Sequence, residues 1–265
     1  MQGLMSFFLV LLLLPSGVSA TSIVAVRNDD EIVIGADSKT TLTQVYYNVR
    51  EPEDIAKCKI VQAGSLFFAS AGSAGLGSVD MPGYVSPEFN LKELIAHGLR
   101  GDGKIGEKVT NLEKLLVLNL TQIAERVRKD NPAFFLQKFV RYPAHTIIIA
   151  GLEDENLILM VRTFRLVVLP SGSLSCEVGR FTCPGDCEAS FITIFEGQTE
   201  AIGNYLRGNE NFLYSTDPVV AVRDLVEMEI TQDPSAVGPP VDILRLTRRG
   251  AEWVQRKSLC PDIKN

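Results

Sequence analysis

Thr21 is the residue whose position most directly predicts chemistry. It follows Met1–Ala20, an uncharged segment with an apolar run from Phe7 to Leu14 and small residues at positions −3 and −1, the pattern of a cleaved signal peptide. Cleavage would leave Thr21 with a free α-amine, whose pKa of about 7.7–8.0 lets it accept a proton near neutral pH. A threonine hydroxyl needs such a base to become a nucleophile. The sequence therefore predicts an exported protein, either periplasmic or extracellular, in which Thr21 is a candidate N-terminal nucleophile.

The same N-terminal segment leaves an alternative open. Met1–Ser6 carries no Lys or Arg, although signal peptides usually begin with a positive charge. An uncleaved anchor or a misassigned start codon is therefore the alternative, but the apolar run is shorter than the roughly 20 residues that span a bilayer. We expect signal peptidase to be the partner that exposes Thr21.

Two β-hairpins are predicted to position Thr21. Both consist of β-branched or apolar runs separated by turn residues: Thr21–Arg27 and Glu31–Ala36 around Asn28-Asp29-Asp30, then Lys57–Ala63 and Leu66–Ala71 around Gly64-Ser65. Two helical segments follow a Gly/Pro-rich stretch. The longer helix is indicated by apolar residues at three- and four-residue steps from Leu112 to Val127.

The second half of the chain repeats the order of strands and then helices. Strands are predicted at Thr146–Gly151, Leu157–Val168 and Ser190–Phe195, with Cys-rich loops before the last of them. Helices are predicted at Thr199–Arg207 and after Asp217-Pro218, and a hairpin of Val241–Leu246 and Glu252–Gln255 ends the chain. This order predicts one α+β domain over residues 21–265, with two sheets packed together and helices on both outer faces.

Three stretches of the chain share a pattern of residue types with a known family. They are Thr21-Ser22-Ile23-Val24-Ala25-Val26 with Ile32-Val33-Ile34-Gly35-Ala36-Asp37-Ser38-Lys39, then Phe67-Phe68-Ala69-Ser70-Ala71-Gly72-Ser73-Ala74-Gly75, and Val241-Asp242-Ile243-Leu244-Arg245-Leu246 with Gly250-Ala251-Glu252-Trp253. Together they resemble the opening strands, the Ala-Gly turn and the closing hairpin of proteasome β subunits. The resemblance implies the four-layer αββα sandwich of N-terminal-nucleophile (Ntn) hydrolases, with two antiparallel sheets flanked by helices.

The resemblance also implies which residues surround the nucleophile. Asp37 would lie under Thr21 and hold Lys59, whose cation disfavours the protonated α-amine and stabilises negative charge on the hydroxyl oxygen. Gly72 would offer its backbone N–H to the oxyanion. Asp233 is a loose match to an acid that follows the last large helix in the family. Because the region between Asp37 and Lys59 is longer than in the family, Lys57 remains a rival for the lysine position.

The chain departs from the family pattern at two further places. Ala20 precedes the nucleophile where self-processing subunits have Gly, so signal peptidase would replace autolysis as the unmasking step. The family's serine in a Gly-Ser-Gly turn has only Glu196-Gly197-Gln198 as its positional counterpart. The network of hydrogen bonds that tunes the α-amine is therefore only partly matched.

The resulting functional prediction is amide hydrolysis by a threonine peptidase, with hydrolysis of small non-peptide amides as an alternative. A homo-oligomeric ring is implied by the resemblance alone. A second alternative is a catalytically inactive member of the family that serves as a scaffold or binding module. A third places the nucleophile at Ser73, in an incomplete Gly-Xaa-Ser-Xaa-Gly elbow with His145 as the base.

Composition and cysteine spacing limit the other classes of partner. The net charge is −6 and the 26 Lys and Arg residues are scattered, so we expect no nucleic-acid partner. Export would permit disulfides, and the Cys183–Cys187 loop could close on itself or share a bridge with Cys176. The pairing of Cys58 and Cys260 is left open. A zinc site would need a second Cys/His pair with ligand spacing, so we expect neither a metal nor a cofactor.

Overall fold

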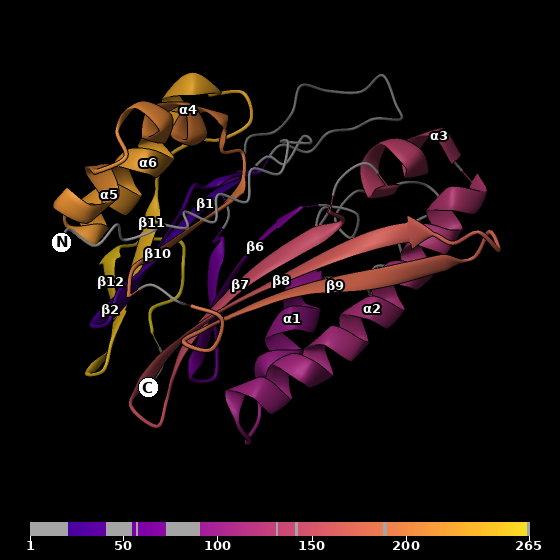
Figure 1. Ribbon diagram of the computed structural model, residues 1–265, viewed down its shortest axis with the longest axis horizontal. Helices are drawn as coiled ribbons and strands as arrows, with labels where there is room; N and C mark the ends of the chain where they lie inside the picture. The colour runs from indigo at the N-terminus through magenta and orange to yellow at the C-terminus, as the bar shows by residue number, and fades with distance from the viewer. Residues whose placement is uncertain are drawn as a thin grey trace, which may run out of the picture.

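The computed structural model describes residues 21–40, 55–56, 58–72, 91–130, 132–140, 143–187 and 190–263. The predicted signal peptide, the rival lysine Lys57 and the alternative nucleophile Ser73 lie outside the described residues. Within them the chain is α+β, with two five-stranded antiparallel sheets, a short two-stranded sheet and several helices (Figure 1). The predicted fold class is confirmed at this level.

The first sheet is built on the hairpin that begins at Thr21. Its strand order is β10-β1-β2-β11-β12, with β1 at Ser22–Arg27, β2 at Glu31–Ala36, β10 at Ile192–Gly197, β11 at Asp242–Thr247 and β12 at Gly250–Gln255. The Asn28 side chain accepts hydrogen bonds from the backbone N–H groups of Asp30 and Glu31, which closes the predicted turn. The N-terminal strand is therefore an interior strand, paired on both sides.

The second sheet has the order β5-β6-β7-β8-β9. Its strands are β5 (Ile60–Ala63), β6 (Leu66–Gly72), β7 (His145–Glu153), β8 (Asn156–Val168) and β9 (Leu174–Cys183). The turn between β5 and β6 has Gly64 at a φ of 63°, a conformation that glycine adopts without steric cost. The remaining pair, β3 (Lys39–Thr40) and β4 (Ile55–Ala56), forms a separate small sheet.

Strand β9 corrects the prediction of Cys-rich loops between β8 and β10. It pairs with β8 over ten residue pairs, from Leu159–Cys183 to Val168–Leu174. Most side chains of this edge strand are only partly buried, and its sequence lacks the strong apolar alternation that identifies a strand. The loop prediction was wrong because pairing with β8 stabilises a strand whose own pattern is weak.

The helices form two groups on opposite sides of the sheets (Figure 1). The first group is α1 (Leu91–Leu99), α2 (Ile105–Asp130), α3 (Pro132–Phe135) and a π-helical turn, η2 (Leu136–Val140); the second is α4 (Glu200–Gly208), α5 (Phe212–Ser215) and α6 (Pro218–Gln232). Asp217 caps α6 as predicted, because its carboxylate accepts hydrogen bonds from the N–H groups of Val219 and Val220. No helix in the described ranges is long and apolar enough to cross a membrane.

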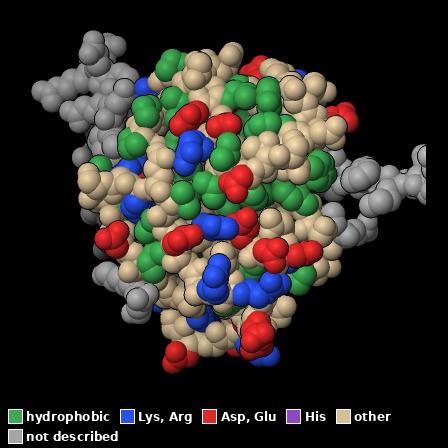
Figure 2. Space-filling view, turned by 90° about the vertical axis from the view of Figure 1, so that its left-hand side faces the viewer, with side chains coloured by type: hydrophobic (Ala, Val, Ile, Leu, Met, Phe, Trp, Pro, Cys, Tyr) green, Lys and Arg blue, Asp and Glu red, His purple; other side chains and the backbone are tan. Residues whose placement is uncertain are grey.

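Separate apolar clusters join the layers. Ile23 and Ile34 of the first sheet pack with Phe67 and Ile148 of the second, so the two sheets face each other. A second cluster joins the outer face of the second sheet to α1 and α2, and a third joins the outer face of the first sheet to α4 and α6. On the side of the molecule seen in Figure 2, acidic and basic side chains are intermingled with apolar ones. The described elements therefore stack as helices, sheet, sheet and helices.

Candidate active site

Thr21 lies directly before β1, at the end of the first sheet. Its carbonyl oxygen accepts a hydrogen bond from the Gln198 N–H at 2.7 Å, and Ser22 is paired with Gly197. The partly buried Thr21 is thus fixed by the segment that joins β10 to α4. The backbone of this segment therefore holds the backbone of Thr21 in place.

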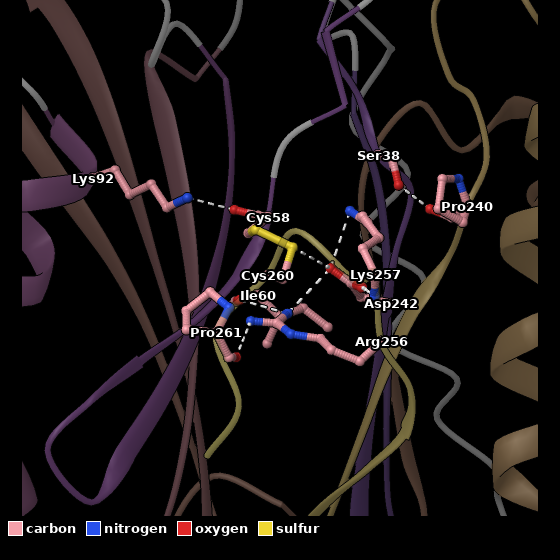
Figure 3. Close-up of a disulfide and its surroundings, with 10 residues drawn as sticks. All are labelled: Ser38, Cys58, Ile60, Lys92, Pro240, Asp242, Arg256, Lys257, Cys260 and Pro261. Atoms are coloured by element: carbon pink, nitrogen blue, oxygen red, sulfur yellow. Dashed lines mark hydrogen bonds and ion pairs between the residues drawn. A yellow bond between two sulfur atoms is a disulfide. The ribbon is translucent and has the colours of Figure 1, made fainter. Parts of the chain in front are cut away.

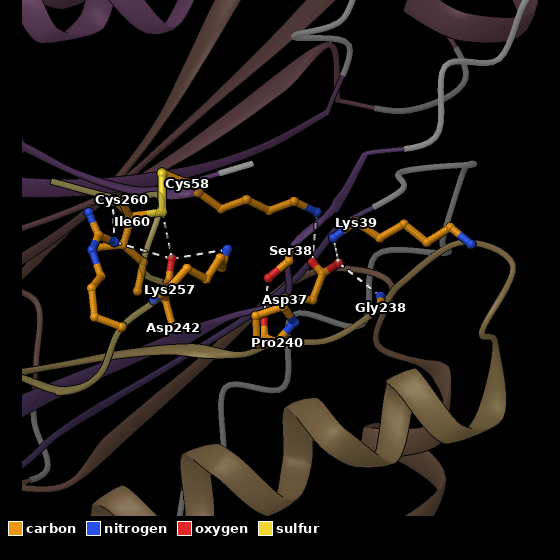
Figure 4. Close-up of polar contacts among 12 residues, drawn as sticks. Asp37, Ser38, Lys39, Cys58, Ile60, Gly238, Pro240, Asp242, Lys257 and Cys260 are labelled. Atoms are coloured by element: carbon orange, nitrogen blue, oxygen red, sulfur yellow. Dashed lines mark hydrogen bonds and ion pairs between the residues drawn. A yellow bond between two sulfur atoms is a disulfide. The ribbon is translucent and has the colours of Figure 1, made fainter. Parts of the chain in front are cut away.

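Asp37 is a fully buried carboxylate that follows β2. It accepts hydrogen bonds from the backbone N–H groups of Ser22 at 2.9 Å, Lys39 at 2.9 Å and Gly238 at 3.2 Å. A buried carboxylate is stable only when such donors replace water. These three donors come from the start of β1, from Lys39 after β2 and from the loop after α6. Figure 4 shows the contacts of Asp37 with Lys39 and Gly238.

Lys59 completes the site from the second sheet. Its ammonium group lies 2.7 Å from Asp37 Oδ1 and donates a hydrogen bond to Thr21 Oγ1 at 2.9 Å. The Lys59 side chain is only 7% exposed and that of Asp37 is 0% exposed, so water screens the ion pair little. The structure therefore brings together three of the predicted site residues, Thr21, Asp37 and Lys59.

Gly72 ends β6 and is paired with His145 at the start of β7. Its φ is 114°, and a Cβ atom there would lie 2.8 Å from the Ala144 carbonyl oxygen and 2.9 Å from His145 Cα. Both contacts are with backbone, so only glycine fits without a shift. The packing explains why glycine is needed at this strand end, and the oxyanion role of Gly72 stays a prediction.

Asp233 has a local role in the described contacts. It ends α6, and its Oδ1 accepts hydrogen bonds from the N–H groups of Ser235 and Ala236, both at 3.2 Å, as well as from the Ser235 hydroxyl at 2.5 Å. These contacts close the turn that leads to Gly238. The residue thereby shapes the loop that supports Asp37, and its predicted part in the chemistry remains a prediction.

Glu196 is a candidate functional residue that the sequence analysis noted only as part of Glu196-Gly197-Gln198, the loose counterpart of the family's Gly-Ser-Gly turn. It is paired with Ile23 on β1, two residues along the strand from Thr21, and lies on the face that packs against the second sheet. Its carboxyl group hydrogen-bonds the Thr146 side chain on β7, and burial raises the pKa of Glu196 to about 7. The strand alternation could have placed this side chain inward, but nothing in the sequence indicates its partner.

His145 is fully buried, and burial lowers its pKa to about 3. Neither ring nitrogen has a hydrogen-bond partner within the described part of the chain. An imidazole held neutral in this way is a poor proton acceptor at neutral pH. This environment disfavours the alternative in which His145 is the general base for a serine nucleophile.

Disulfides join Cys58 to Cys260 and Cys183 to Cys187, and Cys176 is a free thiol. The second pairing confirms the possibility that the Cys183–Cys187 loop closes on itself. No group of three or more His, Cys, Asp or Glu side chains with metal-binding geometry occurs in the residues that the structure describes.

No model of a known protein family matches the chain, and no curated protein matches it.

Proposed function

We propose that the chain beginning at Thr21 is an N-terminal-threonine amide hydrolase with the αββα sandwich of the Ntn type. The observation that carries the proposal is the position of the Lys59 ammonium group, 2.9 Å from Thr21 Oγ1 and 2.7 Å from Asp37 Oδ1. A hydroxyl that accepts a hydrogen bond from a buried cation has its own proton free for transfer to a base. The cation also stabilises the negative charge that develops on the oxygen.

The proposed reaction begins when the Thr21 α-amine takes the hydroxyl proton, directly or through a water molecule. Thr21 Oγ1 forms a bond to the carbonyl carbon of an amide, and the N–H of Gly72 donates to the oxyanion. The C–N bond then breaks, and the proton carried by the α-amine passes to the leaving nitrogen. Water attacks the resulting ester, releases the acid and restores the hydroxyl.

The order of the layers, helices, sheet, sheet and helices, supports the proposal of an Ntn fold. The two antiparallel sheets face each other, and the nucleophile precedes an interior strand of one sheet while Lys59 precedes an edge strand of the other. A site that draws its groups from both sheets is held by the packing between them. Peptides are the substrate class that the resemblance favours, and small amides are the alternative.

The test compares chains that start at Thr21 with the full chain that retains residues 1–20. Chains that start at Thr21 are made with a removable fusion partner whose cleavage leaves Thr21 at the N-terminus. Activity is measured on a panel of peptide and small amide substrates. We expect activity only with a free Thr21, retention of activity in Thr21→Ser, and loss in Thr21→Ala. Equal activity of Thr21→Ala and wild type would refute the proposal.

A further inference from the structure

Both sequence neighbours of Lys59 are held by one distant segment of the chain. Figure 3 shows these neighbours, Cys58 and Ile60, with Cys260 and Arg256. The preceding residue, Cys58, is disulfide-bonded to Cys260, which lies 202 positions later in the sequence. The following residue, Ile60, accepts a hydrogen bond through its carbonyl oxygen from Arg256 Nη1 at 3.2 Å. Residues 256–261 therefore hold the backbone on both sides of Lys59, and we call them the C-terminal segment.

The C-terminal segment is itself fixed by a buried carboxylate, Asp242 on β11. Asp242 is 0% exposed and accepts hydrogen bonds from Arg256 Nη1 at 3.1 Å and from the Lys257 N–H at 3.0 Å. The Lys257 ammonium group lies 3.0 Å from the same carboxylate. Arg256 also donates to the Pro261 carbonyl oxygen at 3.1 Å, which holds the segment in a closed turn. A buried carboxylate with this many partners has little freedom to move.

Asp242 connects this segment to the other half of the candidate site. In the first sheet it is paired with Ala36, the residue before Asp37. Figure 4 shows Asp37 and the Asp242–Lys257 pair side by side at this end of the sheet. Burial lowers the pKa of Lys257, and the negative charges of Asp242 and Asp37 oppose that shift. Asp242 and the C-terminal segment therefore lie beside both Asp37 and Lys59, the two residues that surround Thr21.

We propose that the C-terminal segment positions the Lys59 ammonium group against Thr21, with the Cys58–Cys260 disulfide as its main anchor. This inference rests on the proposed function. Lysine has a long, flexible side chain, so the place of its ammonium group depends on how firmly its backbone is held. A displacement of about 1 Å in a catalytic group reduces a rate by up to about 100-fold. Lys59 is thus the catalytic residue that contacts the reacting hydroxyl of Thr21, and Cys58, Arg256 and Cys260 are positioning residues.

The test uses the chain that begins at Thr21 and compares the double variants Cys58→Ala/Cys260→Ala and Cys183→Ala/Cys187→Ala. Each loses one disulfide, but only the first touches the flanks of Lys59. We expect the first to lower kcat about tenfold or more while KM changes little, and the second to match wild type. Because a displaced cation no longer disfavours the protonated α-amine, the acidic limb of the kcat–pH profile should move to higher pH in the first variant alone.

Chemical reduction gives the same comparison in a chain that has already folded. In the Cys183→Ala/Cys187→Ala background, a dithiol reductant transfers two electrons and two protons to the Cys58–Cys260 bond and leaves as its own cyclic disulfide. The fluorescence of Trp253, which stacks under Arg256, reports whether the fold persists. If loss of the disulfide unfolds the chain, the Arg256→Gln variant with its Cys58–Cys260 disulfide intact is used in its place. The acidic limb of its kcat–pH profile is expected to move to higher pH in the same way.

The outcomes separate this inference from the proposed function. If Thr21→Ala abolishes activity but disulfide loss or Arg256→Gln leaves the acidic limb in place, the inference fails and the proposed function stands. A similar fall of kcat in both double variants would also overturn the inference, because it would show a general effect on folding. If activity does not depend on Thr21, the proposed function fails.

Discussion

Two buried Asp–Lys ion pairs lie at the same end of the first sheet and differ in what the lysine reaches. The Asp37–Lys59 pair is 2.7 Å long and the Asp242–Lys257 pair 3.0 Å, and each carboxylate is 0% exposed. The two carboxylates are neighbours across the sheet, since Asp242 on β11 is paired with Ala36, the last residue of β2, and Asp37 comes directly after it. Burial and pairing are therefore nearly the same at the two positions.

The two ion pairs differ in the further groups that they contact. Lys59 donates to a hydroxyl, Thr21 Oγ1, whereas the carboxylate of the Lys257 pair is shared with Arg256 and a backbone N–H. A lysine that donates to a hydroxyl can stabilise charge during a reaction. A lysine whose carboxylate partner also binds Arg256 and a backbone N–H contributes to the fold. Burial of an ion pair alone does not identify a catalytic residue.

The largest effect is expected at Lys59. The variant Lys59→Met should lower kcat by about 1,000-fold, because a buried donor to the reacting oxygen is lost. Lys257→Met should lower kcat about tenfold at most, since it changes only the support of the site. Steady-state kinetics on the best amide substrate measures both, and equal losses would show that the two pairs do not differ in the way we describe.

The loss of stability should also be larger at Lys59. Lys59→Met leaves the fully buried Asp37 without its ion-pair partner, and we expect a loss of about 3 kcal/mol in the free energy of unfolding. Lys257→Met should lose less, because Asp242 keeps its ion pair with Arg256 and its hydrogen bond from the Lys257 backbone N–H. Urea unfolding of both variants measures the difference. A greater loss in Lys257→Met would contradict this account of the two pairs.

Acid sensitivity is expected from His145, the buried histidine paired with Gly72. Burial lowers the pKa of its imidazole to about 3 from 6.5, so the unfolded chain binds the extra proton as the pH falls below about 6.5. Stability should therefore decrease by about 2 kcal/mol between pH 6.5 and pH 5. Unfolding across this range should show a flatter slope in His145→Leu, whereas exposed His97→Gln should keep the wild-type slope.

The smallest effect, of opposite sign, is expected at Glu196. Burial raises the pKa of Glu196 to about 7. The stability that its protonated carboxyl group contributes is therefore fully present below the ordinary carboxyl pKa and is lost as the pH rises through about 7. Glu196→Gln should therefore be about 1 kcal/mol more stable than wild type at about pH 8, since partial exposure screens the charge. The two should match at about pH 4, and exposed Glu210→Gln should match wild type throughout.

Local patterns in the sequence were enough to predict most of the fold. The hairpin of β1 and β2, the apolar face of α2 and the capped start of α6 each depend on residues close together in the chain. Strand β9 was missed because it is defined by its pairing with β8. The association of Thr21, Asp37 and Lys59 was expected from the resemblance, and the structure places them within hydrogen-bonding distance.

The features that could not be predicted depend on residues far apart in the sequence. The Cys58–Cys260 bridge spans 202 positions, and five cysteines allow many pairings when only spacing is known. Burial of Glu196 against Thr146 likewise requires the two sheets to be in place. Such contacts arise from tertiary packing, which local propensity does not encode.

The most direct test of the central claim is where an acylating probe becomes attached. Protein recovered from the exported fraction of its host is treated with a peptide β-lactone, and intact mass, N-terminal sequencing and peptide mapping are measured on the product. We predict a chain that begins at Thr21 and carries the acyl group on Thr21 Oγ1, with much slower labelling of Lys59→Met. A chain that begins elsewhere, or an acyl group on another residue such as Ser73, would contradict the account.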